Sequence, residues 1–206
     1  MEHDHSDFNK EIDFQSKENP LLWFKDLYQD AILKNCTSPN VMVVSTSTLS
    51  HRISSRVVYL REILEEGLCF YTNYNSRKGK TLEENPLCSA LFFWQELEIQ
   101  VRVEGICEKL PSEMSDIYFS SRPRLNQLNA WASKQSESIN SRNDLEKAME
   151  YYDKKFPQIV PRPDFWGGFL IKPNYFEFWK GRLGRLHDRF SYELIDNNWQ
   201  IQRLAP

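Results

Sequence analysis

The sequence lacks the excess of positive charge and the paired cysteines that mark several common functional classes. Its formal net charge is −3 and its pI is near 5.9, so it has no overall attraction for nucleic acid or for an anionic membrane. Any anion-binding site must therefore be local. Four cysteines stand far apart without a Cys-X-X-Cys pair, which favours reduced thiols in the core over a metal or redox centre. They are Cys36, Cys69, Cys88 and Cys107.

The sequence also lacks long apolar runs. Residues 1–14 are polar and acidic, without the cationic start and apolar stretch of a secretory signal. No later segment approaches the ~20 apolar residues that span a bilayer. We therefore expect a cytoplasmic protein without a membrane partner. Residues 1–18 show no periodicity and are expected to be mobile, which leaves residues 19–206 as a single domain with one buried core.

Short β-rich runs are abundant from position 41 onward. Five of them fall within about 70 residues, and most of their connections are too short for crossover helices, which predicts an antiparallel meander that can close as a barrel. These runs cover 41–47, 56–63, 68–73, 88–94 and 99–110. Four later runs, at 165–172, 175–180, 189–195 and 198–204, predict four more strands. The expected class is mainly β.

Helical patterns lie at both sides of the first strand block. One helix is expected to begin at Asn19-Pro20 and to pack on the core through an apolar face. Others are expected at 111–121, at 124–133 and from Ser141, where Asp144 completes a capping box. The last helix carries an apolar stripe that is expected to be core. The face of the first helix is Leu21, Phe24, Tyr28 and Ile32, and the stripe of the last is Leu145, Ala148, Met149, Tyr152 and Phe156.

A first candidate anion site lies in residues 71–80, where a strand runs into a short helix. Ser76 can cap that helix, so free backbone N–H groups and cationic side chains such as Arg77 and Lys78 converge at its positive end, which favours a phosphate. A solvated basic turn explains these residues equally well. A nucleotide P-loop is excluded, because it would need glycine where Tyr74 stands.

A second candidate site lies in residues 180–189, directly after the aromatic run 175–179. Four cations and one imidazole beside a tryptophan could bind a phosphorylated aromatic ring through charge-assisted hydrogen bonds and stacking. An edge of surface salt bridges with Trp179 in the core is about as good an explanation. A third cluster, residues 118–124, again combines hydroxyl groups with guanidinium groups. Three such sites in an acidic protein suggest more than one bound phosphate.

The same regions carry motifs that occur together in one family. In order along residues 19–206 they are NYNSRKGKTLEENP, QVRVEG, YFSSRPR, AWASKQS, FWGG, EFWKGRLGRLHDR and RLAP. This ordered series resembles the pyridoxine/pyridoxamine 5′-phosphate oxidases. The resemblance implies an antiparallel split β-barrel of the FMN-binding type with peripheral helices. It also implies a homodimer that holds flavin mononucleotide (FMN) at the subunit interface.

The resemblance further implies which residues hold FMN and substrate. The FMN-binding set would be Arg56, Val57, Val58, Tyr59, Leu60, Arg61, Tyr71, Thr72, Arg77, Lys78, Gln100, Gln135, Ser136, Trp179 and Arg189, partly from the second subunit. The substrate-binding set would be Arg61, Tyr118, Arg122, Asn126, Arg185, Leu186 and His187. Arg185 and His187 would be the catalytic pair, and their spacing places both on one face if the segment is extended.

The reaction implied is oxidation of pyridoxine 5′-phosphate and pyridoxamine 5′-phosphate to pyridoxal 5′-phosphate, with O2 as acceptor and H2O2 as product. Hydride passes from the substrate's C4′ to the flavin, and the protein supplies orientation and a route for the proton. Arginine stays protonated and is a poor general base, so Arg185 is expected to orient the substrate and stabilise charge.

Several positions depart from the family pattern, mostly on the substrate side. Arg61 stands where the family usually has lysine, Asn126 where it has serine, and Ser38 where it has aspartate. An arginine fork is not equivalent to a lysine point charge at a phosphate. These departures motivate an alternative, a diverged FMN- or pyridoxal-phosphate-binding relative with little oxidase activity. A split-barrel flavin enzyme that uses a nicotinamide donor is a third interpretation, against which the retained Arg185-Leu186-His187 argues.

Overall fold

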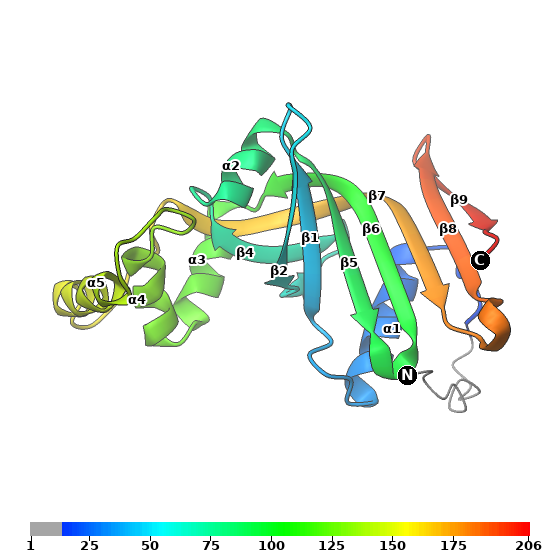
Figure 1. Cartoon of the computed structure of the whole chain (residues 1–206), viewed down its shortest axis with the longest axis horizontal. Helices are drawn as coiled ribbons and strands as arrows, with labels where there is room; N and C mark the ends of the chain where they lie inside the picture. Colours follow the sequence, from blue (N-terminus) through cyan, green and yellow to red (C-terminus); the bar gives the residue numbers. More distant parts are fainter. Residues whose placement is uncertain (1–13) are drawn as a thin grey trace.

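The computed structural model describes residues 14–206, and it consists of one antiparallel sheet with helices around it (Figure 1). The strands are β1 (Val41–Ser47), β2 (Ile53–Tyr59), β3 (Glu62–Ile63), β4 (Leu68–Asn73), β5 (Leu87–Trp94), β6 (Ile99–Lys109), β7 (Trp166–Lys180), β8 (Asp188–Ile195) and β9 (Asn198–Arg203). The helices are α1 (Pro20–Leu33), α2 (Arg77–Glu84), α3 (Ser112–Ser121), α4 (Arg124–Ala132) and α5 (Arg142–Lys155), with short 3-10 turns η2 (Gln95–Leu97) and η3 (Leu183–Arg185).

The sheet is curled, and the strands at its two ends, β2 and β3, follow one another in the sequence. Its strand order is β2-β1-β5-β6-β7-β4-β3, and β8 and β9 extend from β7. The terminal strands β2 and β3 are separated only by Leu60 and Arg61, which turns the meander into a half-open barrel. The backbone N–H of Arg61 donates to the Cys69 carbonyl at 2.9 Å and so ties this connection to β4.

Strand β7 divides the molecule into two regions. Its first half pairs with β4, its second half pairs with β8, and β6 pairs with it from Phe169 to Lys180. The change of partner coincides with a register shift in β6 between Glu104 and Gly105, opposite Pro173. Proline is tolerated in a strand at such an irregularity. A Cβ on Gly105 would lie 2.1 Å from the Lys172 carbonyl oxygen, so the close approach there requires glycine.

The core lies inside the curled sheet and is closed by α1. Asn19 caps α1 by accepting from the N–H groups of Leu21 and Leu22, and Pro20 occupies the first helical position, as predicted. Trp23 stacks on Phe178 of β7 with a centroid distance of 4.1 Å. The buried residues of α1 are Pro20, Leu21, Trp23, Phe24, Leu27 and Ala31, whereas the predicted face residue Ile32 is exposed.

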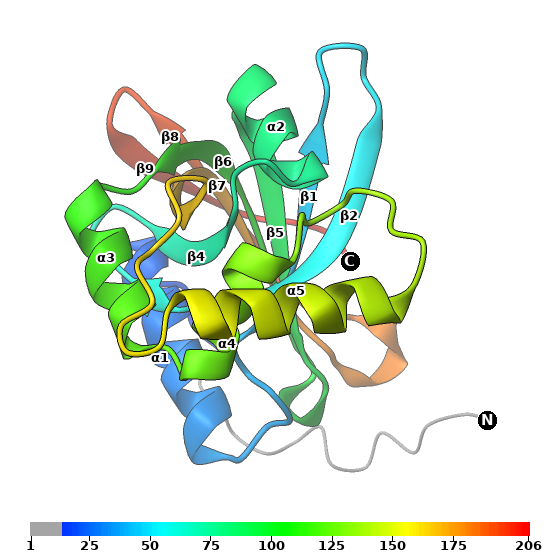
Figure 2. The same ribbon diagram turned by 90° about the vertical axis from the view of Figure 1, so that its left-hand side faces the viewer.

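Helices α3, α4 and α5 form a helical arm at one end of the sheet (Figures 1 and 2). The arm has its own small core, in which Phe119 and Leu128 pack against Trp166 at the start of β7. The predicted capping box of Ser141 and Asp144 is present at α5. The α5 stripe, predicted to be core, faces this small core: Met149, Tyr152 and Phe156 pack against it. The stripe is half-buried and no α5 residue is fully buried, because the helix lies on the outside of the arm (Figure 2).

The sequence predicted the two runs 41–47 and 68–73 with their observed bounds, but other strands differ. The run 56–63 is two strands, because the chain turns at Leu60-Arg61 to reach β4. The runs 165–172 and 175–180 are one strand, β7, because β6 pairs with both. The later block therefore has three strands instead of four. All four cysteines are buried and unbridged, as predicted, and burial raises the pKa of Cys69 to about 12.

Most of the segment predicted to be mobile, residues 1–18, lies outside the described residues. Its last part packs on the sheet, where Phe14 is buried and the Lys17 carbonyl accepts from the Tyr192 hydroxyl at 2.7 Å. Among residues 14–206, no helix is long and apolar enough to cross a membrane, and no three metal-ligating side chains cluster.

Candidate active site

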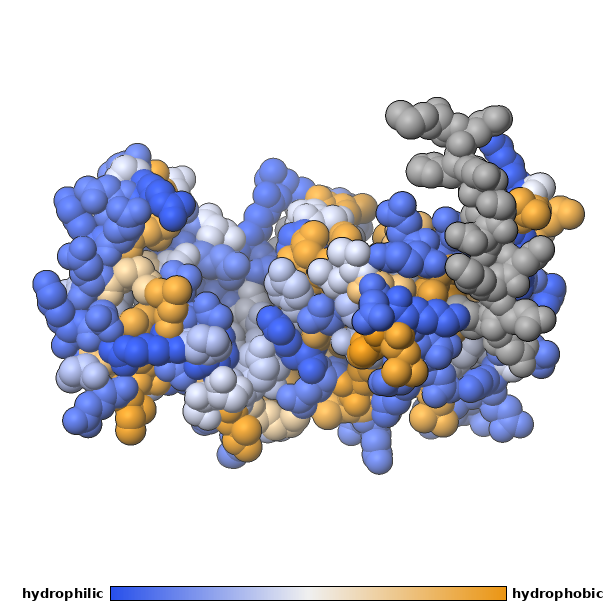
Figure 3. Space-filling model, turned by 90° about the horizontal axis from the view of Figure 1, so that it is seen from below, coloured by the Kyte–Doolittle hydropathy of each residue, from blue (hydrophilic) through white to orange (hydrophobic). Residues whose placement is uncertain are grey.

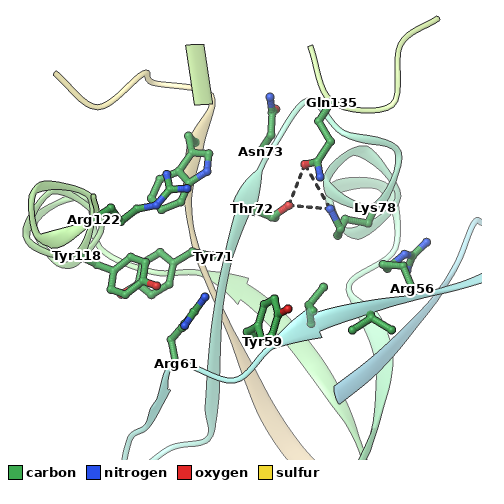
Figure 4. A pocket seen from close by; sticks show the side chains of 13 residues that line it. Arg56, Tyr59, Arg61, Tyr71, Thr72, Asn73, Lys78, Tyr118, Arg122 and Gln135 are labelled. Carbon is green, nitrogen blue, oxygen red and sulfur yellow. Dashed lines mark hydrogen bonds between the residues drawn. The ribbon is translucent and has the colours of Figure 1, made fainter. Parts of the chain in front are cut away.

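A pocket of about 400 Å³ lies between the barrel and the helical arm (Figure 4). Its floor is the end of β2 and the end of β4, and its walls come from α2, α3, the segment after α4 and the start of β7. It is lined by Arg56, Val57, Val58, Tyr59, Arg61, Tyr71, Thr72, Asn73, Lys78, Tyr118, Arg122, Gln135 and Trp166. Seen from below, the mainly hydrophilic surface is indented between the arm and the barrel (Figure 3).

One end of the pocket carries two cations that bond only to neutral groups. Lys78 is 8% exposed and donates to the Thr72 hydroxyl at 2.7 Å and to the Gln135 side-chain oxygen at 3.4 Å. Burial, and then the neighbouring charge of Arg56, lower the pKa of Lys78 to about 8. Arg56 donates to the Val44 carbonyl and to the hydroxyls of Thr46 and Ser54. Within residues 14–206, neither cation pairs with a carboxylate.

The N-terminus of α2 adds backbone donors beside these cations. The Ser76 hydroxyl caps the helix by accepting from the Gly79 N–H at 3.3 Å, as predicted. The Arg77 N–H reaches the Ser136 hydroxyl at 3.2 Å, which brings the segment after α4 to the helix end. A Cβ on Gly79 would lie 2.1 Å from the Tyr74 carbonyl oxygen, so only glycine allows this tight entry into the helix. A helix N-terminus with adjacent cations attracts an anion.

The opposite end of the pocket holds a second group of cations. Arg61 follows β2, and Tyr118 and Arg122 come from the end of α3 (Figure 4). Burial lowers the pKa of Arg122; the nearby Tyr118 raises it and the charge of Arg61 lowers it further. The Nη1 of Arg122 is buried without a hydrogen-bond partner. A buried, unpaired guanidinium nitrogen is costly, and its position at the pocket makes it a donor available to a ligand.

Stacked aromatic rings line the end of the pocket that holds Arg61 and Arg122 (Figure 4). Tyr71 of β4 stacks on Tyr118 with a centroid distance of 3.9 Å and lies 5.6 Å from Trp166. The Arg122 guanidinium lies 4.4 Å from the centre of the Trp166 ring, which fixes its plane by a cation–π contact. The Tyr71 hydroxyl is also buried without a partner, and burial is the main cause of the raised pKa of Tyr71.

A second group of predicted residues lies on the other half of β7, away from the pocket (Figure 1). Gln100 of β6 pairs with Trp179 of β7, and Trp179 pairs with Arg189 of β8, so the three form one row across three strands. The His187 ring lies 4.7 Å from the Trp179 ring. The Nδ1 of His187 accepts from the backbone N–H of Arg182 at 3.1 Å, so the neutral ring carries its hydrogen on Nε2.

The segment Arg185-Leu186-His187 is not extended, contrary to the premise of the spacing argument. Residues Leu183–Arg185 form a 3-10 turn, and Gly184 and Arg185 both have positive φ, 67° and 62°. Arg185 and Leu186 are exposed. A non-glycine residue in the left-handed region is uncommon and marks a turn with a specific shape.

The pocket therefore gathers about half of the predicted site residues in one chain. Arg77 and Ser136 lie beside it, and the buried Leu60 side chain and the exposed Asn126 are not among its lining residues. Two lining residues, Asn73 and Trp166, were not predicted. They are register partners on β4 and β7, and this pairing between distant segments leaves no signal in the local sequence pattern.

Comparison with known proteins assigns the family. The family model described as pyridoxamine 5′-phosphate oxidase matches residues 28–155, and the pyridoxine 5′-phosphate oxidase C-terminal dimerisation region matches residues 166–206. The chain belongs to the pyridoxine/pyridoxamine 5′-phosphate oxidase family. Relatives with that name include one from Nostoc sp., 46% identical over 190 residues covering 91% of this chain and 89% of the relative. Another, from Haemophilus influenzae, is 44% identical over 189 residues, covering 92% and 90%.

Solved structures agree with this family. PhzG from Burkholderia lata 383, solved with tetrahydrophenazine-1-carboxylic acid, has a TM-score of 0.89 at 29% identity and covers 93% of this chain and 95% of its own. An FMN-binding protein from Nostoc punctiforme related to pyridoxamine 5′-phosphate oxidase has a TM-score of 0.73 at 15% identity, covering 93% and 100%, and so supports the fold. The predicted split barrel, oxidase class and FMN cofactor are confirmed, and the dimerisation region supports a homodimer.

The residues present fit a phosphorylated flavin. The end of the pocket at Lys78 offers two cations without carboxylate partners and the N-terminus of a capped helix, which is a donor set for a dianion. The other end offers an unpaired guanidinium nitrogen on Arg122. A cationic group at each end of the pocket, with stacked aromatic rings beside one of them, suits phosphorylated ligands that carry planar rings.

Proposed function

We propose that this protein oxidises pyridoxine 5′-phosphate and pyridoxamine 5′-phosphate to pyridoxal 5′-phosphate, with bound FMN as cofactor, O2 as acceptor and H2O2 as product. The observation that carries the proposal is the pocket with a cationic group at each end, in a chain 42–47% identical to oxidases of that name. Pocket size also agrees, because small-molecule sites commonly enclose roughly 300–1,000 Å³.

The flavin phosphate would bind at the end of the pocket formed by Lys78, Arg56 and the N-terminus of α2. A phosphate there gives Lys78 the counter-charge that it lacks, and it would lie at the positive end of α2, beside the Ser136 hydroxyl that accepts from the Arg77 N–H. Thr72 and Gln135, which now bond to Lys78, orient its ammonium group toward the pocket. Bound FMN supplies the hydride acceptor and is reoxidised by O2 with release of H2O2.

The substrate phosphate would bind at the other end, between Arg61 and Arg122. Arg122 has a free Nη1, and its plane is already fixed by the contact with Trp166, so it offers a preorganised donor. Tyr118 adds a hydroxyl group beside the two cations. This end selects a phosphorylated substrate over an uncharged one, because a substrate without phosphate would leave two guanidinium groups unpaired in a partly buried site.

The second group of residues would complete the site from the partner subunit. In one chain, Gln100 of β6, Trp179 in the second half of β7 and Arg189 of β8 form the row, and none of them lines the pocket. Trp179 and Arg189 lie in the region that matches the family's dimerisation model, residues 166–206, and Gln100 pairs with Trp179 from β6. A twofold dimer that places the row of one subunit over the pocket of the other would form two equal sites.

Arg185 and His187 would then act on the substrate ring from that partner subunit. Because Nδ1 of His187 accepts from the Arg182 N–H, its Nε2–H can donate to a ring substituent. His187 could accept a proton from the substrate only if its hydrogen bond with the Arg182 N–H were broken, since Nδ1 is its only unprotonated nitrogen. Arg185 is permanently charged, so it orients the ring and stabilises charge instead of taking a proton.

Steady-state peroxide production with each phosphorylated vitamer tests this function. We expect turnover with both compounds, one FMN per subunit in the purified dimer, and no turnover with the unphosphorylated vitamers. Bound FMN or pyridoxal 5′-phosphate without peroxide production would instead establish a diverged binding protein. Turnover that requires a nicotinamide donor would establish a different flavin enzyme of this fold.

A further inference from the structure

A buried carboxylate, Glu177, lies in the row next to Gln100, Trp179 and Arg189. Glu177 is two residues before Trp179 on β7, so both side chains lie on the same face of the sheet. The next row on that face is Arg102 of β6, Glu177 and Ser191 of β8. Glu177 is only 4% exposed, and neither the pocket nor the proposed substrate contacts use it.

Glu177 connects the two rows through ion pairs. Its Oε1 accepts from both Nε and Nη2 of Arg189, at 3.0 and 2.7 Å, and its Oε2 lies 3.0 Å from Nη2 of Arg102. Nη1 of Arg189 donates to the Ala205 carbonyl at 2.8 Å. Of the five N–H donors of a guanidinium group, these bonds use three, which leaves one on each terminal nitrogen of Arg189 for a ligand.

This arrangement fixes the plane and direction of the Arg189 guanidinium. Two donors on one carboxylate oxygen and a third on a backbone carbonyl hold an otherwise flexible side chain in one orientation, beside Trp179. Arg102 in turn balances the second oxygen of Glu177, so the buried carboxylate has a cation on each side. A structural ion pair needs only one of these contacts, whereas a ligand-binding arginine benefits from all three.

We infer that Glu177 is a positioning residue that holds the Arg189 guanidinium in the orientation in which it contacts FMN. The inference rests on the proposed function, in which Arg189 is an FMN-binding residue. Glu177 itself does not reach the flavin. Removing the Glu177 carboxylate should therefore weaken FMN binding only through Arg189, and the effects of substituting Glu177 and Arg189 on FMN affinity should not be additive.

A double-mutant cycle on FMN affinity tests the inference. The dissociation constant for FMN is measured by fluorescence quenching in the wild type, Glu177→Gln, Arg189→Gln and the double variant, all as dimers. We expect Glu177→Gln to raise the dissociation constant about tenfold, a typical coupling between neighbouring residues, and to add less than about twofold in the Arg189→Gln background. Glu104→Gln is the matched control, because Glu104 Oε1 lies 3.3 Å from Arg102 Nε on the same face, and within residues 14–206 Glu104 forms no ion pair with Arg189.

The outcomes separate the inference from the proposed function. If Arg189→Gln leaves FMN affinity unchanged, the assignment of Arg189 to the flavin fails. If Arg189→Gln weakens binding but Glu177→Gln does not, or if their effects are additive, the positioning role is overturned. Glu177→Asp keeps the charge and should recover part of the affinity, which provides a second readout if Glu177→Gln does not yield a stable dimer. Equal losses of FMN affinity in Glu177→Gln and Glu104→Gln would also contradict the inference.

Discussion

The two groups of candidate site residues differ in how their cations are balanced. In the pocket, Lys78 and Arg56 bond to hydroxyl, amide and carbonyl oxygens, and Arg122 has a nitrogen without any partner. On the other half of β7, Arg189 and Arg182 each pair with a carboxylate, Glu177 and Asp188 respectively. The pocket thus holds uncompensated positive charge, whereas Arg189 and Arg182 are already balanced. Lys180, which donates to the Leu97 carbonyl, and the exposed Arg185 are the cations of the β7–β8 region without a carboxylate partner within residues 14–206.

This difference predicts separate roles for the two regions: the pocket attracts the phosphorylated ligands, and the β7–β8 region orients them. Cations that are buried without counter-ions raise the free energy of the empty pocket. A bound phosphate pairs with them and removes much of this cost, so the pocket should supply most of the affinity for FMN. Paired arginines gain little from a second anion, but their side chains are held in place. The β7–β8 region should therefore contribute mainly to geometry and to the chemical step.

The largest effect is expected at Arg185, in the β7–β8 region. Arg185→Leu should lower kcat/KM by about 10²–10³, as the loss of one preorganised electrostatic donor does, while FMN content and the dimer remain. Arg185→Lys keeps the charge without the planar fork and should fall between. Kinetics and flavin occupancy measured on the same samples check this, and unchanged kcat/KM in a fully flavinated Arg185→Leu dimer would refute the role.

A substitution in the pocket should have an effect of similar size, but on the affinity for FMN. Lys78→Met removes a buried cation from the flavin phosphate and should raise the FMN dissociation constant about 10²-fold, the typical cost of breaking a buried charge pair. Lys80→Met on the same helix is the control, because Lys80 is exposed. Fluorescence titration measures both. If the two variants bind FMN equally well, the pocket does not act through uncompensated charge.

The pKa of Lys78 predicts a pH dependence for FMN binding. The free group has a pKa of about 8, and a bound phosphate favours its charged form and raises that pKa. Binding above pH 8 must therefore take up a proton, so FMN affinity should fall as pH rises from 8, by at most about tenfold per pH unit. Dissociation constants between pH 7 and 10 check this. A flat profile in the wild type, or an unchanged slope in Lys78→Met, contradicts it.

The smallest effect is expected at the substrate end of the pocket. Arg61→Lys exchanges a planar fork for a point charge, so KM for the phosphorylated substrate should change by several-fold while FMN affinity is kept. The cation itself remains, which limits the effect. Steady-state kinetics and FMN titration of the two proteins decide, and equal KM values remove Arg61 from phosphate binding.

Local patterns in the sequence predicted the parts of the site that are built locally. The Ser76 cap, the strand before it and the cationic residues after it form one continuous segment whose geometry depends on near neighbours. The turn at Arg185 was missed, because the positive φ values of Gly184 and Arg185 have no periodic signal. The unbroken β7 was missed because Pro173 interrupts the strand pattern, whereas pairing with β6 continues past it.

The division of the site into two regions could not be read from the sequence. It depends on the register of Gln100, Trp179 and Arg189 across three strands and on the change of partner in the middle of β7. Both arise from contacts between residues far apart in the chain. The resemblance to the family named the residues and implied that some come from the second subunit, but only the folded chain shows which of them lie away from the pocket.

The central claim is that each active site combines the pocket of one subunit with the β7–β8 region of its partner, and a mixed dimer tests it most directly. Lys78→Met and Arg185→Leu subunits are co-expressed with different tags, and the dimer that carries both tags is purified and assayed at an FMN concentration that fills the wild-type site but not the Lys78→Met site. Twofold symmetry places both substitutions in one site and leaves the other intact, so the mixed dimer should recover about half of the wild-type activity. A mixed dimer no more active than the two parent variants would show that both groups serve the same subunit.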